Sequence, residues 1–166
     1  TLDDGYKDNR DFAYPVFKRH NAPFTIYVTA DFADGRGDLW WLSLEEALRR
    51  QSDVTLDMDG QRRHFVLGTA EEKDYAFHEI YWWLRTLPEP LARTITQRLA
   101  RDAGLDTNAF FRDLVMTWDE IRALAADPLV TIAAHTCTHY VLSKLTDAEA
   151  HREIAESAQR IETELG

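Results

Sequence analysis

Two short runs rich in β-branched and aromatic residues constrain the fold most, residues 24–29 (FTIYVT) and 129–134 (LVTIAA). Neither run has the 3.6-residue periodicity of a surface helix, and each follows a proline, Pro23 or Pro128, that ends a helical stretch. Continuous apolar runs of this length are typical of strands buried in a parallel sheet. The sequence therefore predicts an α/β fold, with residues 1–2 as the stub of an earlier strand.

Four positions carry the pattern of a helix N-terminus, a Ser or Thr followed three residues later by Glu. In this capping box the hydroxyl and the carboxylate satisfy backbone N–H groups that otherwise lack partners. The pattern predicts a helix-rich protein, and an apolar stripe on one face marks the last helix. The pairs are Ser43 with Glu46, Thr69 with Glu72, Thr117 with Glu120 and Thr146 with Glu149, and the stripe comprises Ile154, Ala158, Ile161 and Leu165.

The middle of the chain, residues 39–112, interrupts the alternation of helix and strand. A hairpin is predicted to turn at Asp59-Gly60, because an acidic residue followed by glycine suits positive φ. Two helices are predicted to follow, at about 71–86 and 89–103. We interpret this segment as an insertion subdomain of a single domain.

Composition narrows the classes of function. A 166-residue chain that is 45% hydrophobic is expected to be globular. The formal net charge of −10 argues against binding to nucleic acid or anionic membranes. The single cysteine, Cys137, excludes an intrachain disulfide framework. No apolar run approaches the roughly 18 residues of a membrane helix, so we expect a soluble chain. This 166-residue sequence has no initiator Met and no leader, and it does not indicate a cellular compartment.

The sharpest local pattern is residues 135–139, HTCTH, directly after the second apolar run. Two strand residues four apart are separated by about 13 Å, too far to share one metal, whereas on a helical turn they lie about 6 Å apart. The strand should therefore end at Ala134, so that both imidazoles project from its carboxyl end, where α/β proteins keep their sites. Taken alone, the pair is also typical of ordinary surface histidines.

A second polar motif, Asp3-Asp4-Gly5, follows the first strand stub. Adjacent strand residues point to opposite faces, so both carboxylates can serve one site only where the strand turns, which Gly5 permits. Alone, this motif is also typical of a polar loop. Together the motifs supply two imidazoles and one or two carboxylates, a set that Zn²⁺ favours and that Co²⁺, Mn²⁺ or Ni²⁺ accept. Three protein ligands leave a position for water, as in catalytic metal sites.

These motifs carry a family resemblance. Residues 1–6, TLDDGY, resemble the Thr-Phe-Asp-Asp-Gly motif of polysaccharide deacetylases with the nodulation-protein-B homology domain, carbohydrate esterase family four. Residues 135–139 resemble the family's His-Ser/Thr-x-x-His motif, and the flanks at 132–134 and 142–143 match as well. Residues 15–28 are similar to the family's second helix-strand stretch.

The resemblance implies a function and assigns roles. Family enzymes remove N- or O-linked acetyl groups from polysaccharides or oligosaccharides. Their fold is an irregular (β/α) barrel. The resemblance implies that Asp3 is the catalytic base and that Asp4, His135 and His139 bind one divalent metal, Zn²⁺ before Co²⁺, Mn²⁺ or Ni²⁺. We therefore expect a metal-dependent carbohydrate deacetylase acting on carbon–nitrogen bonds, with a carbohydrate as its substrate.

The sequence also departs from the family pattern. The stretch between Asp4 and His135 is longer than in compact members, and the chain ends before the later motifs, which include the general-acid histidine. We expect residues 1–166 to be a single partial domain that binds metal but is weakly active or inactive alone. We expect its open sheet edge to be covered by a second copy or by further sequence. Two alternatives stay open: a catalytically incomplete carbohydrate-binding or regulatory relic, and a related hydrolase of small amides.

The remaining candidate residues have ordinary structural explanations. Cys137 is expected to be a packed thiol, because its position in the family motif is variable. Isolated histidines are expected on the surface, and the aromatic cluster is expected to pack in a core, with stacking on sugars left open. The histidines are His20, His64, His78 and His151, and the aromatic residues are Trp40, Trp41, Tyr81, Trp82 and Trp83.

Overall fold

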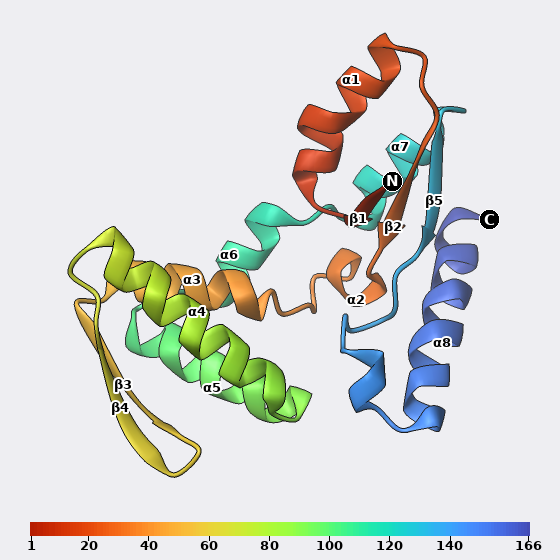
Figure 1. Ribbon diagram of the computed structural model, residues 1–166. Helices are drawn as coiled ribbons and strands as arrows, with labels where there is room; N and C mark the ends of the chain where they lie inside the picture. The colour runs from red at the N-terminus through yellow and green to blue at the C-terminus, as the bar shows by residue number, and fades with distance from the viewer. The chain divides into compact units, whose positions relative to one another are not determined.

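The computed structural model describes residues 1–166 and divides them into two units. The sheet unit consists of Thr1–Asp38 together with Phe111–Gly166, and the hairpin unit is Leu39–Phe110. Helix α6, Thr107–Leu114, spans the boundary between them (Figure 1). The two segments of the sheet unit are therefore separated in the sequence by the whole hairpin unit.

The sheet unit is built on three parallel strands in the order β1-β2-β5. The strands are β1, Leu2–Asp4, β2, Phe24–Val28, and β5, Val130–Ala134. These bounds confirm the α/β class with a parallel sheet and the end of the third strand at Ala134. The three strands form an open sheet and do not close into a barrel.

Helices follow and connect the strands of the sheet unit. A π-helical turn, Asn9–Ala13, leads into α1, Tyr14–Arg19, and the four-residue α2, Ala30–Ala33, follows β2. Helix α7, Trp118–Ala125, precedes β5, and a 3₁₀ turn, Leu142–Lys144, precedes α8, Asp147–Leu165. Figure 1 shows α8 beside β5, against which it packs. None of the helices combines the length and the apolar composition needed to cross a membrane.

The core of the sheet unit lies on one face of the sheet. Ile26 and Val28 of β2 are fully buried there. Apolar residues from α1, α7 and α8 complete this core, among them Tyr14, Phe17, Trp118, Ile121, Leu124, Ile161 and Leu165. On the opposite face Asp3 and Tyr27 are exposed at paired positions of β1 and β2. The sheet therefore has one face covered by helices and one face open.

Three of the four predicted capping boxes are confirmed. Thr69, Thr117 and Thr146 are the N-caps of α4, α7 and α8, each with the reciprocal bonds of the capping box. The prediction at Ser43 is wrong, because α3 begins one turn earlier and buries Ser43 in its interior. Burial of Trp40 extends the apolar face of that helix toward its N-terminus. The capping-box pattern carries no information about this burial.

The hairpin unit contains three helices and one β-hairpin. Its elements are α3, Trp40–Arg50, β3, Asp53–Met58, β4, Gln61–Val66, α4, Ala70–Thr86, and α5, Glu89–Asp102. Strands β3 and β4 pair antiparallel, as the sequence predicts. Both turn residues have positive φ, 52° at Asp59 and 77° at Gly60, which suits a two-residue hairpin turn.

Aromatic residues of the hairpin unit mostly pack in its own core. Trp40 is buried and stacks on Tyr81 with ring centroids 5.2 Å apart, while Trp41 and Trp83 are partly buried against the same cluster. Trp82 differs, since 55% of it is exposed. The expectation of core packing is therefore confirmed for the cluster apart from Trp82.

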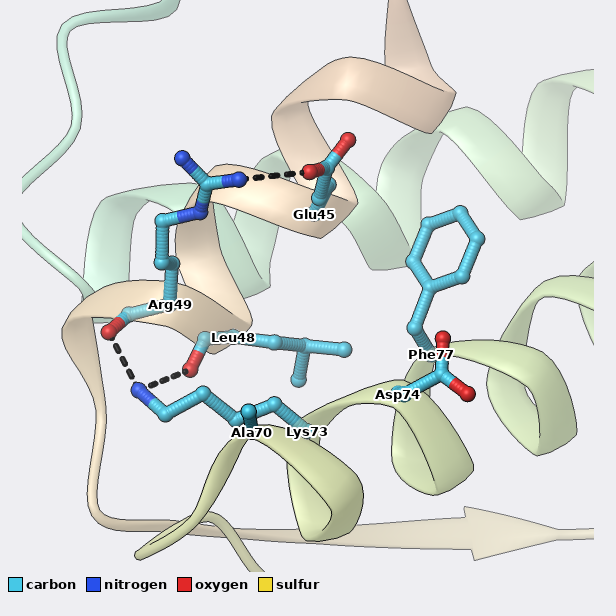
Figure 2. Close-up of a pocket in the computed structure, with 7 residues that line it drawn as sticks. All are labelled: Glu45, Leu48, Arg49, Ala70, Lys73, Asp74 and Phe77. Atoms are coloured by element: carbon cyan, nitrogen blue, oxygen red, sulfur yellow. Dashed lines mark hydrogen bonds and ion pairs between the residues drawn. The ribbon is translucent and has the colours of Figure 1, made fainter.

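A cavity of about 480 Å³ lies beside the end of α3 (Figure 2). Lys73 of α4 donates to the backbone carbonyls of Leu48, Arg49 and Gln51, which have no partner further along the helix. Arg49 in turn pairs with Glu45 at 2.8 Å. Lys73 thus ties α4 to the end of α3, whereas the Arg49–Glu45 pair lies within α3.

Asp127 joins α1 to the turn before β5. Its Oδ1 accepts the Leu129 backbone N–H at 3.0 Å, and its Oδ2 accepts the Tyr14 hydroxyl at 2.7 Å and lies 3.0 Å from Lys18 Nζ. These partners, the Leu129 N–H first, lower the pKa of Asp127 from 3.8 to about 2. The carboxylate is therefore more stable in the folded chain than in the unfolded chain.

We predict that Asp127→Asn lowers the stability of the chain at neutral pH. Because the folded-state pKa is depressed, the contribution of the carboxylate is present above about pH 4 and is lost as the pH falls toward 2. Urea unfolding of both proteins across this range should show a gap that closes on acidification. Asp74→Asn, at an exposed position of α4, is the control, and a gap unchanged at the lowest pH would refute the assignment.

Candidate metal centre

The parallel register brings together side chains that are far apart in the sequence. Asp4, the last residue of β1, pairs with Val28, which pairs with Ala134, the last residue of β5. His135 follows this row directly, and its backbone N–H donates to the Val28 carbonyl at 2.9 Å. Since the strands are parallel, their carboxyl ends meet at one edge of the sheet.

Asp4, His135 and His139 lie together at that edge. The Oδ1 atom of Asp4 is 3.3 Å from His135 Nε2 and 3.1 Å from His139 Nε2. The three potential ligand atoms all lie within 4.8 Å of one another, close enough to hold one metal ion. The structure thus brings together the three residues that the sequence analysis nominated as ligands.

The surroundings of Asp4 Oδ1 fit a bound cation. This atom is buried and has no hydrogen-bond partner, although two imidazole nitrogens lie within 3.3 Å, because neither contact has hydrogen-bond geometry. A buried carboxylate oxygen without a donor is costly and needs an explanation. A divalent ion bound by this oxygen and the two imidazole nitrogens would give all three atoms a partner. Zn²⁺ favours such a set of ligands.

Three residues of the site have a left-handed backbone, which side chains other than glycine rarely adopt. The φ angles are 69° at Asp4, 62° at Thr136 and 60° at His139. Each costs roughly 1–2 kcal/mol relative to the right-handed conformation. Gly5, at φ 82°, completes the turn that aims Asp4. Such strain persists only where surrounding contacts hold it, and it clusters at functional sites.

Hydrogen bonds from the start of helix α2 hold the loop between the two histidines. Three consecutive backbone carbonyls of this loop accept hydrogen bonds from the N-cap and the first two residues of α2. The donors and acceptors are Thr29 Oγ1 to His135 O at 3.1 Å, Ala30 N to Thr136 O at 3.1 Å and Asp31 N to Cys137 O at 2.9 Å. The loop therefore follows the end of β2 instead of extending freely from β5.

Two aromatic contacts at the site were not foreseen from the sequence. The buried ring of Phe32 stacks on His139 with centroids 5.7 Å apart, and the Tyr27 ring lies 6.5 Å from the His135 ring. Both residues belong to β2 or the short helix after it. Their position near the end of a central strand was the one sequence signal that they lie close to the site. The local sequence pattern does not reveal which aromatic ring contacts which histidine.

Asp3 lies beside the cluster on the open face of the sheet. Its side chain is exposed, while its backbone carbonyl accepts hydrogen bonds from the Gly5 N–H at 2.9 Å and from Asn9 Nδ2 at 3.2 Å. In the register Asp3 pairs with Tyr27, whose ring approaches His135. Asp3 therefore shares a face with a residue that contacts the site, and its carboxylate is open to solvent.

The other histidines and the cysteine stay outside the cluster. All four isolated histidines are exposed, which confirms their expected surface positions; they are His20, His64, His78 and His151. Cys137 is a free, half-buried thiol. Burial, followed by the charge of Glu153, raises the pKa of Cys137 to about 11, so the side chain stays a thiol at neutral pH.

Part of this site lies in a region that matches a known protein family. The model of the family described as polysaccharide deacetylase matches residues 64–166, more than half of the chain. The chain belongs to the polysaccharide deacetylase family. The matched region contains His135 and His139, whereas Asp3 and Asp4 precede it. Searches of the curated proteins and of the solved structures found no significant match to this chain.

We predict that His139→Ala and Asp4→Ala each weaken zinc binding by at least roughly 100-fold, since even loss of an outer partner of a ligand costs about 10–100-fold. Competition with a chromophoric chelator at neutral pH measures the affinity. His151→Ala, an exposed histidine of α8, should bind zinc like the wild type. Equal affinity in all four proteins would exclude a site at the sheet edge.

Proposed function

We propose that this polysaccharide deacetylase family member is a metal-dependent hydrolase that removes N- or O-linked acetyl groups from a polysaccharide or an oligosaccharide. The observation that carries the proposal is the convergence of Asp4, His135 and His139 within 4.8 Å. Family membership supplies the class of chemistry and a carbohydrate as substrate. The convergence supplies a reaction centre of the type that this chemistry uses.

The proposed ligands leave room for a reaction. One carboxylate and two imidazoles are three protein ligands, and three-ligand sites keep an open position for water or substrate. A divalent ion held there, for which we propose Zn²⁺ ahead of Co²⁺, Mn²⁺ or Ni²⁺, would polarise the acetyl carbonyl and lower the pKa of water. Asp4 and the two histidines would bind this ion, and the hydrogen-bonded backbone around these residues would keep their side chains in position.

Asp3 is the proposed general base. Its exposed carboxylate directly precedes the ligand Asp4 and lies on the open face of the sheet. From there it would accept the proton of the attacking water as the carbonyl carbon becomes tetrahedral. The carbon–nitrogen or carbon–oxygen bond then breaks and acetate is released. The departing group needs a proton, and none of the residues described is assigned to that step.

The architecture proposed for the chain follows the family. We propose that β1, β2 and β5 belong to an irregular (β/α) barrel whose interior is the open face that carries Asp3 and Tyr27. We propose residues 39–112 as an insertion in that domain, which is consistent with a hairpin unit spanning Leu39–Phe110. Outer edges of β1 and β5 would pair with a second copy or with further sequence.

Two other functions remain as rivals with distinct behaviour. One rival is a catalytically incomplete carbohydrate-binding or regulatory relic, which keeps the metal triad or only the fold. A hydrolase of small amides is the other. Assays with acetylated chito-oligosaccharides against simple acetamides separate the proposed function from the second rival, because only a polymer-directed enzyme prefers the oligomers.

We predict that Asp3→Asn, tested in the full-length protein, lowers kcat/KM for an acetylated chito-oligosaccharide by about 10²–10⁴-fold, the usual contribution of a general base. Zinc affinity should change little, because Asp3 lies outside the ligand cluster. Asp8→Asn, at an exposed position of the same segment, is the control and should keep its activity. Unchanged turnover in Asp3→Asn would refute its role as base.

A further inference from the structure

We infer that Glu153 of α8 is a positioning residue for the metal centre, which it holds through the backbone of the loop between the two histidines. The inference rests on the proposed function of that centre. Glu153 is not one of the clustered ligand residues, and nothing in the local sequence pattern marks it as part of the site. Its effect would reach the metal only through the shape of the loop.

Glu153 binds the loop with both carboxylate oxygens. Its Oε2 accepts the backbone N–H groups of Cys137 and Thr138, each at 2.9 Å. Its Oε1 accepts the Thr138 hydroxyl at 2.8 Å. Two successive N–H groups pointing at one oxygen form a small anion-binding concavity, and bonds to an ionised acceptor are stronger than neutral ones.

The bound segment lies between two strained residues. Cys137 and Thr138 separate Thr136, at φ 62°, from His139, at φ 60°. This sharp path lets His135 and His139 turn back toward the same point, where their Nε2 atoms lie 3.3 and 3.1 Å from Asp4 Oδ1. An extended path would separate the two imidazoles by more than a metal can bridge. Strain at this loop is therefore required by the site.

Two sets of contacts hold the loop from opposite directions. On the carbonyl side, the N-terminus of α2 and its N-cap donate to three consecutive residues, His135 to Cys137. On the amide side, Glu153 accepts the N–H groups of Cys137 and Thr138, and Thr136 Oγ1 accepts the His139 N–H at 3.2 Å. Glu153 makes its contacts from α8, so its loss would remove these three hydrogen bonds between that helix and the loop.

Helix α8 is a firm base for this contact. Thr146 caps its start, and Arg160, two turns after Glu153, binds both oxygens of Asp34 at 2.6 and 2.7 Å. Asp34 also accepts the Trp118 indole N–H at 2.8 Å, which links α8 to α7. The carboxylate of Glu153 thus stands on a helix anchored at several points.

A matched pair of variants tests the inference in this 166-residue chain. Glu153→Ala removes all three acceptor contacts, whereas Glu153→Gln removes the charge but keeps one oxygen that can accept both N–H groups. Glu156→Gln removes the same charge from an exposed position of the same helix and is the control. Zinc affinity is measured by chelator competition, and amide hydrogen exchange at Cys137 and Thr138 reports on the loop without metal.

We expect zinc affinity to fall roughly 10–100-fold in Glu153→Ala, less in Glu153→Gln, and by under twofold in Glu156→Gln. Exchange at Cys137 and Thr138 should accelerate at least about tenfold in Glu153→Ala, because those N–H groups lose their acceptor. A general loss of stability would instead accelerate exchange throughout the β5 core as well. Unchanged loop exchange, or an equal loss of affinity in Glu156→Gln, would overturn the inference.

Failure of the proposed function gives a different result. If the wild-type chain binds no zinc, the metal centre is refuted, while loop exchange in the metal-free variants still decides whether Glu153 holds the loop. If the wild type binds zinc and Glu153→Ala binds it equally well, only the role of Glu153 falls. Glu153→Gln, which preserves the shape of the side chain, gives the same comparison should Glu153→Ala fail to fold.

Discussion

The parallel pairing of β1, β2 and β5 is the constraint on which the site depends. It places Asp4, Val28 and Ala134 in one row, so that the N-terminal carboxylate meets imidazoles from the far end of the chain. A slip of one residue would turn each side chain to the opposite face and remove Asp4 from the cluster. Burial of β2 against the helices prevents such a slip, because it would expose Ile26 and Val28 to water.

The site stores strain, and the scaffold around it offsets that strain. Three left-handed residues cost roughly 1–2 kcal/mol each, a substantial share of the stability of an ordinary domain. Full burial of a single aliphatic side chain such as Ile26 contributes about 1.5–3 kcal/mol, and hydrogen bonds to the loop add to it. The strained geometry at the edge of the sheet can therefore be maintained because the central strand β2 is well packed against the helices.

Elements defined by local chemistry were predictable with good accuracy. The hairpin turn at Asp59-Gly60 needs only the φ preferences of two residues, and three helix starts need only a hydroxyl and a Glu three residues later. Ser43 shows the limit of such reasoning, because burial of Trp40 decided where that helix begins. Local signals are reliable where the partners are neighbours in sequence and fail where a distant core competes.

By itself, the sequence determined which residue types could form a metal centre and that they follow buried strands. Only the tertiary structure decided that Asp4 and the two histidines converge, since distances between segments so far apart depend on strand order and register. It also decided that Glu153, Phe32 and Tyr27 surround the site. Their contacts depend on how α8 and β2 pack, and packing of remote elements leaves no pattern in local sequence.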